Sequence, residues 1–138
     1  MSNVLRPRAL EEALAYRAEH QAVPFGGGTD LMVRYRGYTG TMPHIEGEVL
    51  FLDAVEELHS IRTVGDTLWI GGAATMAEIL AHSAVPELLR RSLALIAAPA
   101  LRNRATLGGN ICNASPAADS LPPLYVHEAE VVVKSRSG

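Results

Sequence analysis

The spacing of apolar residues predicts a mixed α and β fold for the first third of the chain. Apolar residues recur at helical spacing over 10–18, behind Pro7, which is typical of an amphipathic helix. Continuous apolar runs at 22–25 and 49–52 have the length of strands that are buried on both faces of a small parallel sheet. Between these runs we expect a glycine loop and a helix that Gly37 ends.

The pattern changes after residue 57. Residues 60–64 and 67–70 alternate between apolar and polar positions, and they are joined by a Gly-Asp pair that suits a two-residue turn. This predicts an antiparallel hairpin. We therefore divide the chain into a small parallel α/β lobe at 1–53 and an antiparallel α+β lobe at 54–138, with a glycine-rich loop in each.

Helices are expected to dominate the second lobe. Thr75, followed three residues later by a glutamate, has the spacing of a capping box and predicts a helix start. A second helix is expected to begin at Pro86 and to be stopped by Pro99, with Arg90 and Arg91 on its outer face. Further along, the pattern predicts a short helix at 121–126 and a strand at 130–135.

Two glycine-rich stretches, at 26–30 and 106–110, carry the clearest candidate chemistry. Glycine permits φ > 0 and has no Cβ, so successive N–H groups can converge on an anion. A single glycine run is more simply explained as a flexible bend between strand and helix. Because the design occurs twice, we favour two anion sites that hold one diphosphate.

The residues after the second stretch are almost all small. Residues 111–120 are rich in Ala, Ser and Asn, which suits a backbone that lies against a bulky ligand, although close packing of helix and loop would explain the same composition. Asp119 has two interpretations as well. It is either the N-cap of the following helix or an acceptor for sugar hydroxyls of a nucleotide.

Composition limits the classes of function. The formal net charge of −3 and the pI of about 5.9 offer no general attraction to nucleic acid or to an anionic membrane. Cys112 is the only cysteine, which excludes an internal disulfide and an iron–sulfur cluster or zinc site built from this chain's thiolates alone.

No signal peptide or membrane span is evident, so we expect a cytoplasmic protein. The five histidines lack metal-ligand or triad spacing, and no catalytic residue or metal site is predicted.

Three motifs, in this order, resemble the FAD-binding medium subunit of the molybdenum hydroxylases, the carbon monoxide and xanthine dehydrogenase family. They lie at 25–31, 102–111 and 114–123. The resemblance implies an α+β FAD-binding fold of the vanillyl-alcohol-oxidase (PCMH) type, with FAD between the two lobes. It also implies an oxidoreductase subunit that passes electrons from 2Fe-2S clusters through FAD to an external acceptor. The molybdenum cofactor would then belong to a large partner subunit and the iron–sulfur clusters to a small one.

The same resemblance implies a set of cofactor contacts. Residues 26–30 and 106–110 would hold the pyrophosphate, largely through backbone N–H groups, and Ser115 and Asp119 would bind ribityl or ribose hydroxyls. The full set is Phe25, Gly26, Gly27, Gly28, Thr29, Asp30, Leu31, Thr106, Leu107, Gly108, Gly109, Asn110, Ser115 and Asp119.

Subunits of this family continue well past residue 138. We therefore expect the chain to be the truncated, N-terminal part of such a subunit and to be inactive in turnover by itself. Two alternatives stay open from the residues alone. One is a non-catalytic nucleotide-binding fragment, and the other is a different flavoenzyme of the same fold, such as a flavin reductase of cell-wall precursor synthesis.

Overall fold

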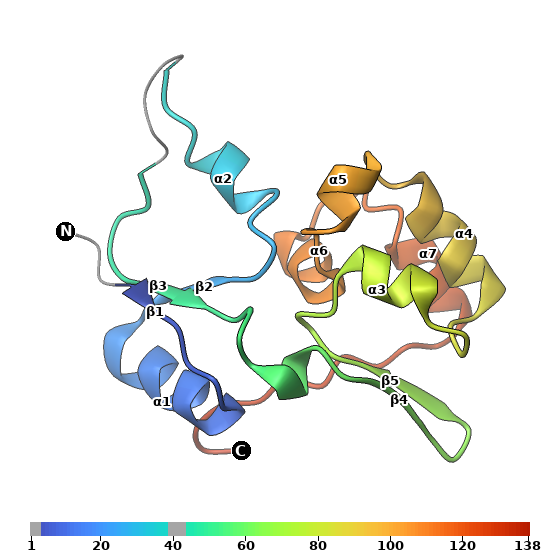
Figure 1. The fold of residues 1–138 in the computed structure, drawn as a ribbon, viewed down its shortest axis with the longest axis horizontal. Helices are drawn as coiled ribbons and strands as arrows, with labels where there is room; N and C mark the ends of the chain where they lie inside the picture. Colours follow the sequence, from blue (N-terminus) through green and yellow to red (C-terminus); the bar gives the residue numbers. More distant parts are fainter. Residues whose placement is uncertain (1–3, 39–43) are drawn as a thin grey trace.

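A small parallel sheet forms from the first third of the chain (Figure 1). The computed structural model of the protein describes residues 4–38 and 44–138. The strand order is β1-β3-β2, and both pairings are parallel. The central position of β3 explains its apolar sequence, because Leu50 is only 2% exposed there. The elements of this part are β1 (Val4–Leu5), α1 (Leu10–His20), β2 (Val23–Phe25), α2 (Leu31–Arg34) and β3 (Val49–Phe51).

The predicted helix and two strands of this part are confirmed, and two details differ. Strand β1 has only two residues, too few to give a pattern in the sequence. Helix α2 ends at Arg34 and not at Gly37, with Tyr35 as its C-cap. Residues 44–48 contain no helix or strand, as expected for the loop predicted at 37–48, and its positions 39–43 lie outside the described residues.

The predicted hairpin is confirmed. After a short 3-10 helix, η1 (Glu56–Leu58), strands β4 (Ile61–Val64) and β5 (Thr67–Ile70) pair antiparallel, with Val64 opposite Thr67. Gly65 in the turn has a φ of 58°, which glycine adopts at little cost. The inner side chains of Ile61, Leu68 and Ile70 pack against the helical core.

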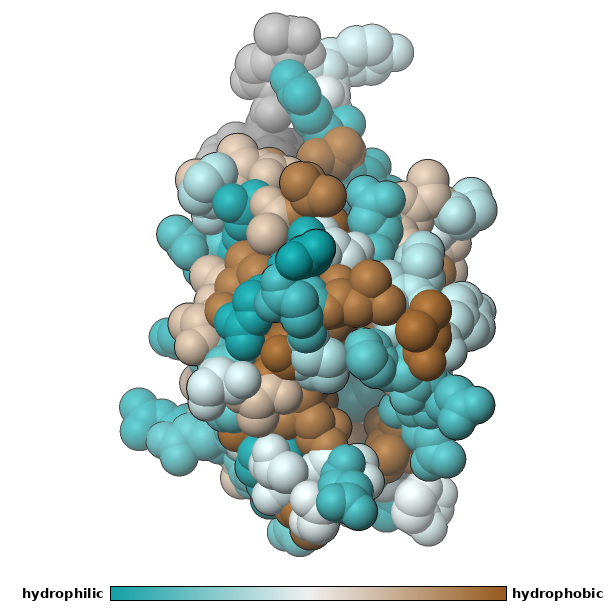
Figure 2. Space-filling view, turned by 90° about the vertical axis from the view of Figure 1, so that its right-hand side faces the viewer, coloured by the Kyte–Doolittle hydropathy of each residue, from teal (hydrophilic) through white to brown (hydrophobic). Residues whose placement is uncertain are grey.

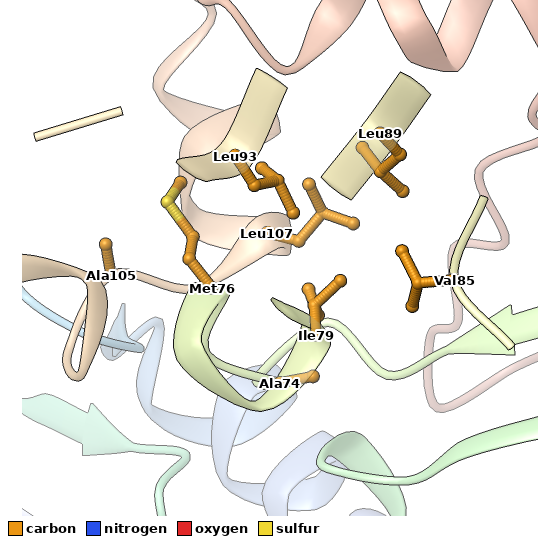
Figure 3. Close-up of a cluster of buried hydrophobic side chains, with 8 residues drawn as sticks. All are labelled: Ala74, Met76, Ile79, Val85, Leu89, Leu93, Ala105 and Leu107. Carbon is orange, nitrogen blue, oxygen red and sulfur yellow. The ribbon is translucent and has the colours of Figure 1, made fainter. Parts of the chain in front are cut away.

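Five helices complete the fold beyond the hairpin. They are α3 (Met76–Ala81), α4 (Glu87–Leu95), α5 (Pro99–Arg102), α6 (Leu107–Asn113) and α7 (Leu121–Val126). The capping box of α3 is confirmed, since Thr75 Oγ1 accepts from Glu78 N and Glu78 Oε2 accepts from Thr75 N at 2.7 Å. Side chains of α3, α4 and α6 converge in one core, where Ile79 and Leu93 are fully buried (Figure 3).

Two predictions about α4 are wrong. Pro99 does not stop this helix, which ends at Leu95, but occupies the first turn of α5, where its missing N–H has no cost. Arg90 does not face out. Its half-buried guanidinium donates to backbone oxygens at the end of α3 and beyond, namely those of Leu80, His82 (2.8 Å) and Val85 (3.2 Å).

The strand predicted at 130–135 is not formed. Residues 129–135 have no regular structure and no strand partner among the residues the structure describes, and Val133 is 82% exposed. A β-branched run becomes a strand only when another strand supplies its hydrogen bonds. The segment instead extends toward α1, where Arg136 Nη1 lies 2.6 Å from Glu19 Oε1 (Figure 1).

The surface beside the helices mixes apolar and polar groups. Figure 2 shows this face, which is the right-hand side of Figure 1. Leu95 on α4 and Tyr125 on α7 are among the exposed large apolar residues, at 85% and 78%. Over residues 4–38 and 44–138, each helix is too short or too polar to cross a bilayer.

Candidate functional site

The first glycine stretch links β2 to α2, and two of its glycines are required for different reasons. Gly28 has a φ of 77°, and a Cβ on it would lie 2.2 Å from the ring of Phe25. Gly27 lacks a positive φ, but a Cβ on it would lie 1.8 Å from the backbone oxygen of Arg104. The stretch therefore lies directly on the chain that leads into α6, as the path of the loop after β2 shows (Figure 1).

This stretch leaves a run of backbone donors unpaired. The N–H groups of residues 26–31 donate to no acceptor within the described part of the chain. Buried or partly buried N–H groups without partners are unusual in folded proteins, because each one loses a hydrogen bond that water would otherwise provide. Six consecutive free donors, the first three of them on glycines, fit an anion such as a phosphate.

The second stretch is different, because it is the start of a helix. Thr106 is the N-cap of α6, and its Oγ1 accepts from Gly109 N at 3.1 Å. The predicted second set of free N–H groups is therefore absent at 107–110. All four groups have protein acceptors, in order the oxygens of Ala74 (3.2 Å), Gly72 (3.0 Å), Thr106 Oγ1 (3.1 Å) and Thr106 O (3.0 Å).

The glycines of the second stretch serve close packing. A Cβ on Gly108 would lie 2.4 Å from Gly72 O, and a Cβ on Gly109 would lie 2.7 Å from Thr106 Oγ1. Across the junction, a Cβ on Gly26 would lie 3.0 Å from the same threonine oxygen. The two stretches are therefore in contact, as the sequence predicted, although only the first offers a run of unpaired backbone donors among the described residues.

A cleft of about 160 Å³ lies where the two stretches meet. It brings together nine of the predicted residues, namely Gly26, Gly27, Gly28, Thr29, Asp30, Leu31, Thr106, Gly109 and Asn110. It also contains residues that were not predicted, namely Pro24, Arg34, Met76, Ala105, Cys112 and Asn113. Asn110 is held in place by Ser120, whose Oγ donates to Asn110 Oδ1 at 2.5 Å.

Five predicted residues do not line this cleft. Phe25 is 7% exposed and packs on Phe51, with ring centroids 4.6 Å apart. Leu107 belongs to the hydrophobic core, and Gly108 contacts Gly72. The remaining two lie further along the chain, in the segment between α6 and α7, and are Ser115 and Asp119.

Asp119 also does not cap a helix. The N-cap of α7 is Ser120, which makes no side-chain capping bond, and the Asp119 side chain is exposed. Its backbone oxygen accepts from Ser92 Oγ. Ser115 has a local role, since its Oγ accepts from Ala117 N at 3.3 Å.

Arg34 is the functional candidate that the sequence interpretation missed. Its Nη2 donates to Asn113 Oδ1 at 2.9 Å, which joins α2 to α6 across the cleft. The available signal was its position one helical turn after Asp30, which places both residues on one side of α2. Asn113 gave no such signal, because its partner is distant in the sequence.

A second, smaller cleft of about 140 Å³ shares Gly26, Gly27 and Thr106 with the first. His59 lines it, and its Nε2 is buried without a hydrogen-bond partner. Asp53 lies at the same cleft, where hydrogen bonds from Arg6 (3.0 and 2.8 Å) hold the pKa of its carboxyl below the ordinary value. Across the described ranges no three His, Cys, Asp or Glu side chains are grouped to hold a metal.

The chain matches a family described as "FAD binding domain in molybdopterin dehydrogenase" over residues 1–138. It is 32% identical to a xanthine dehydrogenase FAD-binding subunit of Escherichia coli O157:H7, over 96% of the chain and 46% of that protein. Among solved structures, it is similar to a Cu,Mo-CO dehydrogenase (TM-score 0.75, 26% identity, 89% of this chain and 43% of that one). It is also similar to quinoline 2-oxidoreductase of Pseudomonas putida 86 (TM-score 0.73, 26% identity, 87% and 42%). The chain spans about half the length of the curated relatives it matches.

Proposed function

The chain belongs to the family of FAD-binding domains in molybdopterin dehydrogenases, and from this premise we propose that its cleft binds the diphosphate of FAD. The family resemblance and the fold class inferred from the sequence are confirmed by this match and by the similar dehydrogenase structures. The contacts to the cofactor are our proposal.

The observation that supports this site most strongly is the run of unpaired N–H groups at 26–31. Phosphate oxygens would accept from these groups. The absence of a Cβ on Gly26 and Gly27 lets the loop lie against Thr106 and Arg104, which brings the two sides of the cleft together. Thr106 and Asn110 face the same cleft from the other side. In this arrangement the diphosphate lies between the lobe at 1–53 and the lobe at 54–138.

The residues fit this cofactor in a second respect. Asn110 is oriented by the buried Ser120, so its amide nitrogen is available to donate to a ligand oxygen. FAD, when bound, would accept electrons and release them again. The residues of this chain would bind and orient it, while Phe25 supports the glycine loop through the contact of its ring with Gly28. We do not include Phe25, Leu107, Gly108, Ser115 or Asp119 among the direct contacts.

The activity of the whole protein follows as a wider proposal. The chain would serve as the FAD-binding part of a molybdenum-containing dehydrogenase, which receives electrons from iron–sulfur clusters and passes them to an external acceptor. Its partners would be a large subunit with the molybdenum cofactor and a small iron–sulfur subunit. A cytoplasmic location, which a single unpaired cysteine favours, belongs to the same proposal.

Titration with FAD and FMN tests the diphosphate site. We expect FAD to bind at least about tenfold more tightly, because the loss of one or more charge-assisted hydrogen bonds costs roughly 1.5–3 kcal/mol each. The measurement is quenching of flavin fluorescence at constant ionic strength. Equal or tighter binding of FMN would contradict the proposed site, and ADP serves as a control that carries the diphosphate without the flavin.

A further inference from the structure

Arg34 is the one basic side chain among the described residues that line the cleft between the two glycine stretches. It projects from α2, directly after the glycine stretch, and its guanidinium reaches Asn113 on α6. The two residues are 79 positions apart, so this bond holds the cation at the junction of both cofactor stretches.

The charge of Arg34 is not neutralised by the protein. No carboxylate lies within 4.0 Å of its guanidinium in the part of the chain that the structure describes. Asp30 is the acidic residue that lines the same cleft, and it forms no ion pair with Arg34. In a chain with a formal net charge of −3, this places a local positive charge beside six unpaired N–H donors.

The chemistry of the side chain suits a phosphate. A guanidinium carries five N–H donors in a planar fork, and the single bond to Asn113 leaves the others available. The fork matches two oxygens of one phosphate group, and a bond between two charged groups is roughly twice as strong as a neutral one.

We propose that Arg34 is a further ligand of the bound diphosphate, with Asn113 as the residue that positions it. This inference rests on the proposed function, because it assigns a residue to the same site. Arg34 then supplies the charge that backbone N–H groups lack, and it favours ligands with a diphosphate over flavins without one.

A purely structural role for Arg34 makes different predictions. If the side chain only ties α2 to α6, its loss weakens the fold and lowers the affinity for every ligand alike. If it binds phosphate, its loss weakens FAD and ADP and leaves riboflavin unchanged. The phosphate contribution also decreases with added salt, because ions screen an exposed charge.

The test compares Arg34→Gln with Arg36→Gln, which removes the same charge two residues later at an exposed position outside the cleft. Dissociation constants for FAD, ADP and riboflavin are measured at about 50 and 200 mM salt, together with the melting temperature. We expect Arg34→Gln to weaken FAD and ADP roughly tenfold to a hundredfold and to reduce their salt dependence. Arg36→Gln should change each by less than about twofold.

Two further results separate the outcomes. Arg34→Lys should restore part of the ADP affinity, since it keeps the charge and loses the fork. The inference is overturned if the two glutamine variants bind ADP equally, or if riboflavin is lost in parallel with ADP. If the unaltered chain binds neither FAD nor ADP, the proposed function itself fails, and the inference fails with it.

Discussion

At the residue scale, the glycines of the site are required for different reasons, a positive φ at one position and a close backbone contact at another. The sequence interpretation noted that glycine permits φ > 0 and has no Cβ, and of the three glycines at 26–28 only Gly28 has a positive φ. Gly27 is required by the close approach of Arg104 O, which a Cβ would meet at 1.8 Å. Since Arg104 lies two positions before the second glycine stretch, Gly27 lets the two sides of the site come together.

Replacement of Gly27 by alanine should therefore destabilise the fold as well as the site. We expect a loss of about 1–3 kcal/mol in the free energy of unfolding, as for other overpacked positions, since the clash is with backbone. Urea unfolding monitored by circular dichroism measures it. Gly72→Ala is the matched control, because a Cβ there meets nothing within 4 Å, and it should change stability by less than about 0.5 kcal/mol. A Gly27 variant as stable as the control would show that the loops can separate without cost.

At the scale of one element, α3 depends on the ionised form of its capping glutamate. Burial raises the pKa of Glu78, but hydrogen bonds from the Thr75 backbone and side chain, with the charge of His59, outweigh this and hold it below its ordinary value of 4.5. A carboxyl with a lowered pKa in the folded state stabilises the protein above the unfolded-state pKa. This stabilisation is lost as the pH falls through the lower, folded-state value.

Glu78→Gln should consequently lower stability at pH 7, by about 0.5–1.5 kcal/mol, and the difference from the unaltered chain should shrink below about pH 4. Thermal unfolding between pH 7 and pH 3 provides the measurement. Glu11→Gln is a suitable comparison, because Glu11 occupies the first turn of α1, is exposed and makes no capping bond. A penalty for Glu78→Gln that is independent of pH would indicate that only the shape of the side chain matters.

At the scale of the whole molecule, the cleft joins a loop of the parallel sheet to a helix of the second part. Gly26 and Thr106 approach each other there, and Arg34 with Asn113 bridges the same gap. A ligand that contacts both sides must therefore stabilise both, because it binds the folded arrangement and not the unfolded chain.

FAD at about one hundred times its dissociation constant should raise the free energy of unfolding by about 2.7 kcal/mol. Amide exchange should slow at both 26–34 and 104–113, and ADP should protect the same segments. Hydrogen exchange read by mass spectrometry, with a thermal shift assay, gives both quantities. The hairpin at 61–70 is an internal reference, since it lines neither shared cleft. Protection of only one segment would contradict a site between the two parts.

The sequence by itself determined those features of this protein that depend on local interactions. The apolar runs of β2 and β3, the Gly65 turn and the Thr75 capping box each depend on residues within a few positions of one another. Periodicity and hydrogen bonding over such short spans are visible in the order of residues. Each glycine stretch is visible in the same way, and the prediction that the two form one site came from the repeated design and from the family resemblance.

Only the tertiary structure decided which groups of that site are available to a ligand. The N–H groups of Leu107 and Gly108 donate to the backbone oxygens of Ala74 and Gly72, more than thirty positions earlier, while those of 26–31 have no acceptor among the described residues. Arg34 reaches the cleft through a partner 79 positions away, and Val131 to Val133 form no strand because no other strand lies beside them among the described residues. Each outcome depends on a contact between distant segments, which local patterns do not specify.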